Sequence, residues 1–213
     1  ALELVLSVHW RQRHELLQLE VPLAQRQPRW AADTSGGVIE RPAEARTPRE
    51  QARWELTALS WIAAPELAVL LDGPQGVSGT GERLTISLLR APTWPDPGAD
   101  NGWQRLRLAL MPCPQGWQPA QVPQEASRFR EPLWIRPAHQ EPDLRSDQAS
   151  KAWLDRRQVL PALGEGLELI ALRAASTPGD WLMAVQNSSP LRRRCCLGDG
   201  WQLVAELDGL DRP

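Results

Sequence analysis

Hydrophobic and polar residues alternate along much of this chain. In the segment LELVLSVHW (residues 2–10), the apolar positions 2, 4, 6 and 8 fall on one face of an extended backbone. In WQRLRLALMP (103–112), Leu106, Leu108 and Leu110 alternate in the same way with Arg105 and Arg107. A period of two residues is typical of half-buried strands, so the pattern predicts strands rather than helices.

Short segments of this kind recur, and most end at proline or glycine. We expect the first two to pair as a hairpin around the polar turn WRQR. The rhythm predicts an all-β fold, an antiparallel β-sandwich with at most one short helix. The predicted strands are 2–10, 14–23, 35–42, 49–64, 67–73, 83–90, 103–112, 166–175, 180–188, 191–197 and 201–210.

Changes in composition divide the chain into three parts. Residues 1–136 form the main sandwich portion and include a proline-rich loop at 90–103. Residues 137–157 are a polar connection, in which 146–157 forms either a short helix or a loop ahead of a strand. Residues 158–213 supply C-terminal strands that complete the sandwich.

Net charge, hydropathy and cysteine content limit the possible binding partners and the cellular location of the chain. The formal net charge is -2, so no positive field favours nucleic acid. No stretch reaches the about 18 apolar residues of a membrane span. Three cysteines without framework spacing favour a reduced, cytoplasmic location. The chain begins inside a strand pattern without methionine, which suggests a piece of a longer polypeptide.

The aromatic residues are biased toward tryptophan. The chain has 11 Trp, one Phe and no Tyr. Two interpretations stay open: a tryptophan-rich surface that binds sugars, or a compositional effect of GC-rich coding DNA, which also favours arginine over lysine.

The sequence contains no self-contained catalytic constellation, so we predict no catalytic residue in it. His9, His14 and His139 lack the spacing of a metal site, and we predict no metal ligand. The adjacent Cys195 and Cys196 are expected to alternate across a strand, with one thiol packed inward.

The loop 90–103 is the strongest candidate for function. It follows a strand and combines three prolines with Arg90, Trp94, Asp96 and Asp100. Such a loop is either a stiff connection, or a long ordered loop that presents hydrogen-bonding groups to a hydroxyl-rich ligand. We expect Arg90 to bond Asp96 or Asp100 and hold its shape.

Several motifs resemble the C-terminal β-domain of glycoside hydrolase family 38 α-mannosidases, and they occur in the family's order. The segment RAPTWPDPGADNG (90–102) is similar to the family's proline-rich signature, and the strand after it departs from the family pattern, with Gln104 at a histidine position. The other similar segments are VHWRQRHELLQLEVPL (8–23), GGVIERP (36–42), ARWELTALSWIA (52–63) and WQLVAELDGLDRP (201–213).

The resemblance implies a sandwich of the galactose-mutarotase-like supersandwich type, within an enzyme that hydrolyses terminal α-linked mannose with retention. It implies that the catalytic aspartates and zinc lie in an N-terminal barrel absent from these residues. This segment itself is then without cofactor and inactive alone. The barrel is its partner, and Arg90, Trp94, Asp96 and Asp100 are the loop residues expected to approach the sugar site, where they meet either the mannoside or the barrel. A carbohydrate-binding module or a purely structural domain are the alternatives.

Overall fold

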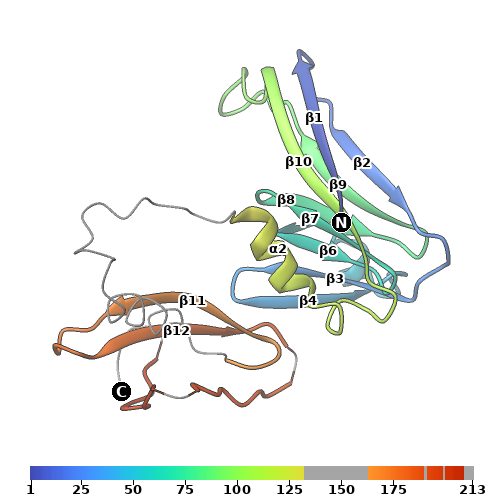
Figure 1. The fold of residues 1–213 in the computed structure, drawn as a ribbon. Helices are drawn as coiled ribbons and strands as arrows, with labels where there is room; N and C mark the ends of the chain where they lie inside the picture. The colour runs from blue at the N-terminus through green and yellow to red at the C-terminus, as the bar shows by residue number, and fades with distance from the viewer. Residues whose placement is uncertain (132–162, 190, 199, 209–213) are drawn as a thin grey trace, which may run out of the picture. The chain divides into compact units, whose positions relative to one another are not determined.

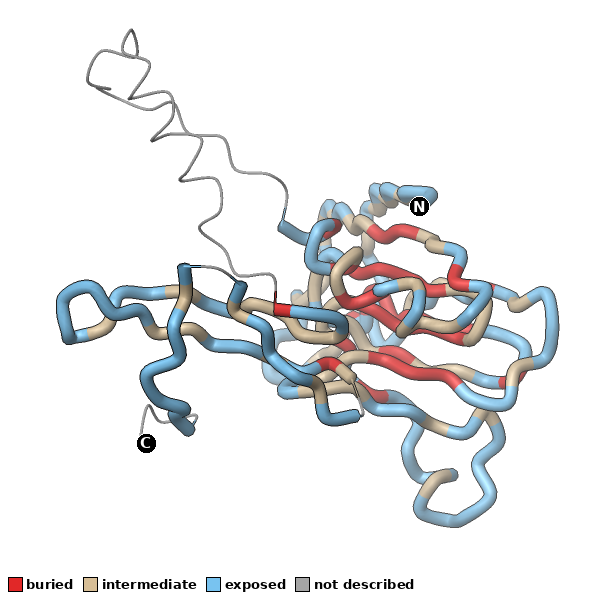
Figure 2. Tube along the Cα trace, turned by 60° about the horizontal axis from the view of Figure 1, so that its bottom comes forward, coloured by how far each residue is buried: buried red, intermediate tan, exposed pale blue. Residues whose placement is uncertain are grey.

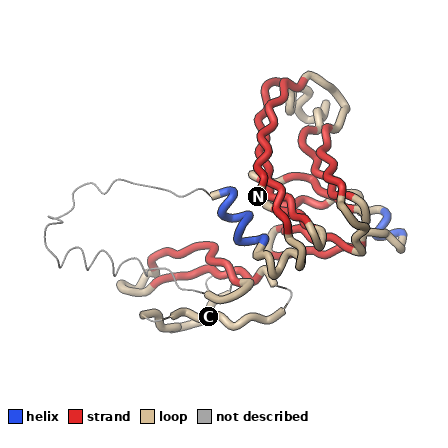
Figure 3. The backbone as a smooth tube through the Cα atoms, turned by 45° about the vertical axis from the view of Figure 1, so that its right-hand side comes forward, coloured by secondary structure: helices blue, strands red, loops and turns tan. Residues whose placement is uncertain are grey.

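The computed structural model describes residues 1–131, 163–189, 191–198 and 200–208. Strands predominate among them, with two short helices (Figures 1 and 3). The chain divides into two compact units, which are described separately. One unit comprises residues 1–132 with 188–190, and the other comprises 133–187 with 191–213.

The first unit is built from two antiparallel sheets. The larger sheet has six strands and the smaller has four. The larger has the order β1 (Leu2–Trp10), β10 (Gly102–Pro112), β7 (Leu67–Leu71), β6 (Trp61–Ala63), β3 (Arg29–Thr34) and β4 (Gly37–Pro42). The smaller has the order β2 (Leu17–Pro22), β9 (Arg83–Leu89), β8 (Gln75–Gly79) and β5 (Leu56–Ala58).

The two sheets pack face to face over one hydrophobic core. Leu84 and Ile86 of β9 contribute from the smaller sheet, and Val69 and Leu71 of β7 contribute from the larger, all without solvent exposure. Figure 2 shows most of the buried residues in the unit that contains the N-terminus. The alternating pattern of the sequence is therefore the inner and outer faces of a sandwich, and the predicted all-β class is confirmed.

Helix α2 (Val122–Arg130) covers the other face of the six-stranded sheet. Its residues Val122, Ala126 and Phe129 pack into a second core with Trp61 and Leu70. The prediction of at most one helix was too low, because a four-residue helix, α1 (Pro48–Gln51), is also present. The spacing of four and three residues along α2 is a helical signal that the strand pattern around it obscured. No helix among the described residues has the length and apolarity needed to span a bilayer.

The predicted N-terminal hairpin is wrong. β1 pairs with β10, from Leu2 opposite Leu110 to Trp10 opposite Gly102, whereas β2 pairs with β9. Residues 11–16 therefore carry the chain from one sheet to the other. Alternation alone does not distinguish a hairpin from such a crossing, because both leave each strand with one buried face.

The second unit contains one hairpin among its described residues, formed by β11 (Leu167–Ala174) and β12 (Trp181–Asn187). The strands predicted at 191–197 and 201–210 are not present in the described parts of these segments, which have no regular secondary structure. The predicted part boundaries, the polar connection 137–157 and the helix at 146–157 all lie outside the described residues. Completion of the sandwich by the C-terminal strands stays a prediction.

Candidate functional site

The proline-rich loop joins β9 to β10 and is closed at its base by Asp100. The backbone N–H groups of Arg90 and Ala91 donate to Asp100 Oδ2, at 2.8 and 3.2 Å. Asp100 has φ +64°, in the left-handed region that Asp tolerates better than most side chains. The expected bond between Arg90 and Asp100 therefore exists, but the backbone of Arg90 makes it rather than the guanidinium. Asp100, near the end of the loop, is thereby tied to the first two residues of the loop.

The remainder of the loop is held by shorter-range contacts. Asp96 Oδ1 accepts from the N–H of Gly98 at 2.8 Å, which stabilises the turn at the tip. The N–H of His14 donates to the carbonyl of Ala91 at 3.0 Å, and His14 Nε2 lies 3.1 Å from Thr93 Oγ1. The loop is thus fastened to the crossing at residues 11–16. The hydrogen bonds therefore give the loop a defined conformation.

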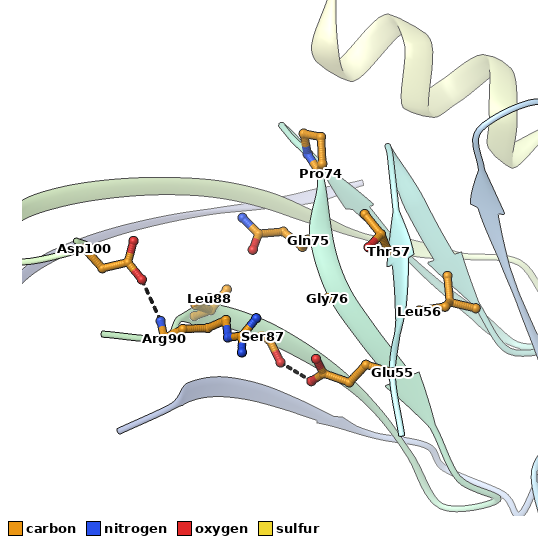
Figure 4. A pocket seen from close by; sticks show the side chains of 10 residues that line it. All are labelled: Glu55, Leu56, Thr57, Pro74, Gln75, Gly76, Ser87, Leu88, Arg90 and Asp100. Carbon is orange, nitrogen blue, oxygen red and sulfur yellow. Dashed lines mark hydrogen bonds between the residues drawn. The ribbon is translucent and has the colours of Figure 1, made fainter. Parts of the chain in front are cut away.

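A polar hollow opens beside the base of this loop (Figure 4). Its volume is about 360 Å³, and β5, β8, β9 and the loop contribute its walls. Arg90 and Asp100 line it from the loop, Ser87 lines it from β9, and Glu55 lines it from the position just before β5. The rest of the lining is Leu56, Thr57, Pro74, Gln75, Gly76 and Leu88.

One end of the hollow is a hydrogen-bonded group of side chains that sequence reasoning missed. The Ser87 hydroxyl donates to Glu55 Oε1, and the amide of Gln18 donates to Ser87 Oγ at 3.1 Å. Gly76 lies beside this group. A Cβ at this position would come within 2.7 Å of Glu55 Oε2, so the absence of a side chain leaves room for the Glu55 carboxylate. The alternation of polar residues on the outer faces of β2, β5 and β9 carried this signal in the sequence, but only the strand order brings them together.

The hollow combines groups suited to a hydroxyl-rich ligand. It presents the carboxylate of Glu55, the hydroxyls of Ser87 and Thr57, the amide of Gln75 and the guanidinium of Arg90. Such donors and acceptors fix the orientation of a small polar ligand. Within the described residues, Arg90 forms no ion pair with Asp96 or Asp100.

The four residues predicted from the sequence divide into two pairs. Arg90 and Asp100 line the hollow together, whereas Trp94 and Asp96 belong to the tip of the loop and are not part of its lining. The Trp94 side chain is 83% exposed. Another exposed tryptophan, Trp103, lies at the start of β10 and stacks on His9 with a 4.9 Å separation of ring centroids.

The described part of the chain does not fit a catalytic metal. No group of three or more His, Cys, Asp or Glu residues within it is arranged to hold a metal ion. His9 is stacked on a tryptophan and His14 is bonded to the loop, while His139 lies outside the described residues.

Comparisons with known proteins agree with the motifs. Residues 1–98 match the family model described as "Glycosyl hydrolases family 38 C-terminal domain". Alpha-mannosidase 2C1 of Mus musculus and that of Homo sapiens are each 37% identical over 136 residues, which is 62% of this chain. An Alpha-mannosidase of Saccharomyces cerevisiae is 29% identical over 108 residues, covering 49% of this chain and 10% of the yeast protein.

The match is to a small part of each relative. The aligned region covers 13% of the mouse and human proteins. The resemblance inferred from the ordered motifs is confirmed, since the family match spans β1 to the proline-rich loop. Residues 1–98 of the chain are therefore similar to the C-terminal domain of glycosyl hydrolase family 38.

Proposed function

We propose that this chain is the C-terminal β-sandwich part of an α-mannosidase, which removes terminal α-linked mannose with retention of configuration. The relatives that it resembles bear the name alpha-mannosidase. In this proposal the catalytic carboxylates and a zinc ion lie in an N-terminal barrel of the same polypeptide. Retaining glycosidases need two carboxyl groups about 5–5.5 Å apart across the scissile bond.

One observation carries the role of this part. The hollow beside the loop brings Arg90 and Asp100 together with Glu55 and Ser87 at the smaller sheet. We infer that this face lies against the barrel, where the Arg90 guanidinium donates to sugar hydroxyls. In this arrangement Trp94, at the exposed tip, packs against the barrel or a sugar ring.

The chain then contributes no step of bond cleavage. Asp100 holds the loop, Arg90 orients the sugar, and the sandwich forms one wall of the sugar site. The parent enzyme is proposed to be cytoplasmic, which agrees with the three free cysteines of this chain.

The test compares the full-length parent enzyme with the 213-residue chain, using an aryl α-mannopyranoside as substrate. We expect hydrolysis by the parent and none by the chain alone. Zinc measured in the parent, and absent from the purified chain, supports the barrel as the metal site. Hydrolysis by the chain alone would refute the proposed division of labour.

A carbohydrate-binding module is the alternative, and a titration separates the two. The isolated chain is titrated with mannose and monitored by tryptophan fluorescence, because a binding module works unaided. We expect no saturable change, since one wall of the sugar site is missing. Saturable binding would favour the module.

A further inference from the structure

The two adjacent cysteines in the second unit differ from the sequence-based expectation. Cys195 and Cys196 were expected on a strand, with one thiol packed inward. Both residues are instead exposed, both are free, and the segment that carries them has no regular secondary structure. The third cysteine, Cys113, is buried in the first unit.

The segment that carries both cysteines belongs to no strand, so the alternation of side chains along a strand is not imposed on it. On a strand, successive side chains point to opposite faces, which would keep two neighbouring thiols apart. Here the N–H of Cys196 donates to the carbonyl of Leu163 at 3.1 Å, whereas the N–H of Cys195 makes no hydrogen bond to another described residue. Consecutive Cα atoms are about 3.8 Å apart, so rotation about the exposed side-chain bonds can bring both thiols to one central atom.

Two exposed thiols at this spacing form a chelating pair for thiophilic elements. Soft ions and metalloids select thiolate ligands over nitrogen and oxygen. Once the first thiol has bound, the second bond forms within the same molecule, which raises the overall affinity by about 10²–10⁴ over a single thiol. We propose that Cys195 and Cys196 form a dithiol site that binds soft metal ions and trivalent arsenicals.

The reaction with an aryl arsenoxide is balanced without an oxidant. Two S–H bonds lose their protons, two As–S bonds form, and the oxygen of the arsenoxide leaves as water. Arsenic stays trivalent and sulfur keeps its oxidation state. Each bound arsenical therefore consumes both thiols, which gives a 1:1 stoichiometry.

Cys113 provides an internal control within the chain. Its Sγ donates to the carbonyl of Ala64 at 3.3 Å, and burial, followed by the charge of Glu66, raises the pKa of its thiol to about 11. The thiolate is the metal-binding form, so Cys113 is poorly suited to react at neutral pH. No reaction at Cys113 is expected while the first unit is folded.

The experiment uses the fully reduced 213-residue chain, phenylarsine oxide and mass spectrometry of the intact protein. We expect one adduct per chain that survives an excess of a monothiol and is released by a small dithiol such as dimercaptopropanol. The apparent affinity should fall at least about 10²-fold in Cys195→Ser and in Cys196→Ser. Cys113→Ser should bind as the wild type does.

Because the cysteines are exposed, both serine variants are expected to fold, and circular dichroism checks this. An adduct that a monothiol displaces equally well from the wild type and from either serine variant would overturn the proposal. Retention of the stable adduct in Cys195→Ser, or its loss in Cys113→Ser, would overturn it as well. None of these results depends on mannosidase activity, so the proposed function is tested separately.

Discussion

The carboxylate of Asp100 is predicted to set the stability of the proline-rich loop. It accepts two backbone N–H groups, and one of these belongs to Ala91, which is 1% exposed. Hydrogen bonds to a charged group contribute about 1.5–3 kcal/mol, and partial exposure of the carboxylate favours the lower end. Removal also leaves the N–H of a buried residue without its acceptor.

Three substitutions separate the hydrogen bonds from the backbone conformation. At φ +64°, Asp100→Ala loses the acceptor and adds left-handed strain of about 1 kcal/mol, for a total of about 2–3 kcal/mol. Asp100→Gly loses the acceptor but relieves the strain, so it should cost about 1 kcal/mol less than alanine. Asp100→Asn keeps a weaker neutral acceptor and should cost about 0.5–1 kcal/mol.

Urea unfolding followed by circular dichroism gives the free energy of unfolding for each variant. Amide hydrogen exchange of the peptide containing residues 90 and 91 reports the loop itself, and it should accelerate in the order Asn, Gly, Ala. The reasoning would be refuted if all three variants unfolded within about 0.5 kcal/mol of the wild type, or if exchange at these amides were unchanged.

Other predictions follow from packing, burial and turn geometry. Gly79→Ala should lower the free energy of unfolding by about 1–3 kcal/mol, because its Cβ would lie 2.7 Å from the Trp30 ring; tolerance in urea unfolding would contradict the packing. Thiol titration with Ellman's reagent at neutral pH should show the 195–196 pair reacting fast and Cys113 only on unfolding. In the folded chain the pKa of the Cys113 thiol is raised from 9.0 to about 11. The free energy of unfolding should therefore fall as pH rises from about 9 toward 11, and a Cys113→Ala variant should lack this decline. Asp33→Ala should cost about 2–4 kcal/mol in thermal or urea unfolding, because Asp33 Oδ1 accepts three backbone amides at 2.9–3.2 Å; an unchanged midpoint would show that water replaces them.

The local sequence pattern was sufficient to predict the sandwich, because each strand buries one face and its apolar residues therefore alternate with polar ones. It was insufficient for the pairing of strands. β1 and β2 follow one another in sequence but belong to different sheets, a choice made by contacts with β10 and β9 that lie far along the chain.

Strand β8 contains Gly76 and Gly79, a residue type that is typical of turns. Both lie in the strand, where the Glu55 side chain and the Trp30 ring approach the backbone closely. Half of the candidate site also depends on tertiary contacts that the local sequence does not reveal. Arg90 and Asp100 were found from an unusual loop, whereas Glu55 and Ser87 look ordinary in sequence and meet them only through the order of the strands.

The most direct test of the proposed role measures kcat/KM of the full-length parent enzyme for an aryl α-mannopyranoside with Arg90→Met. This substitution leaves the backbone bonds to Asp100 available, so the loop should keep its shape. Arg83→Met, at the other end of β9 and ion-paired with exposed Glu20, is the matched control. We expect kcat/KM to fall at least about 10-fold for Arg90→Met, the loss of about one charge-assisted hydrogen bond, and to stay unchanged for Arg83→Met. Equal kcat/KM for Arg90→Met and wild type would contradict a loop that meets the sugar.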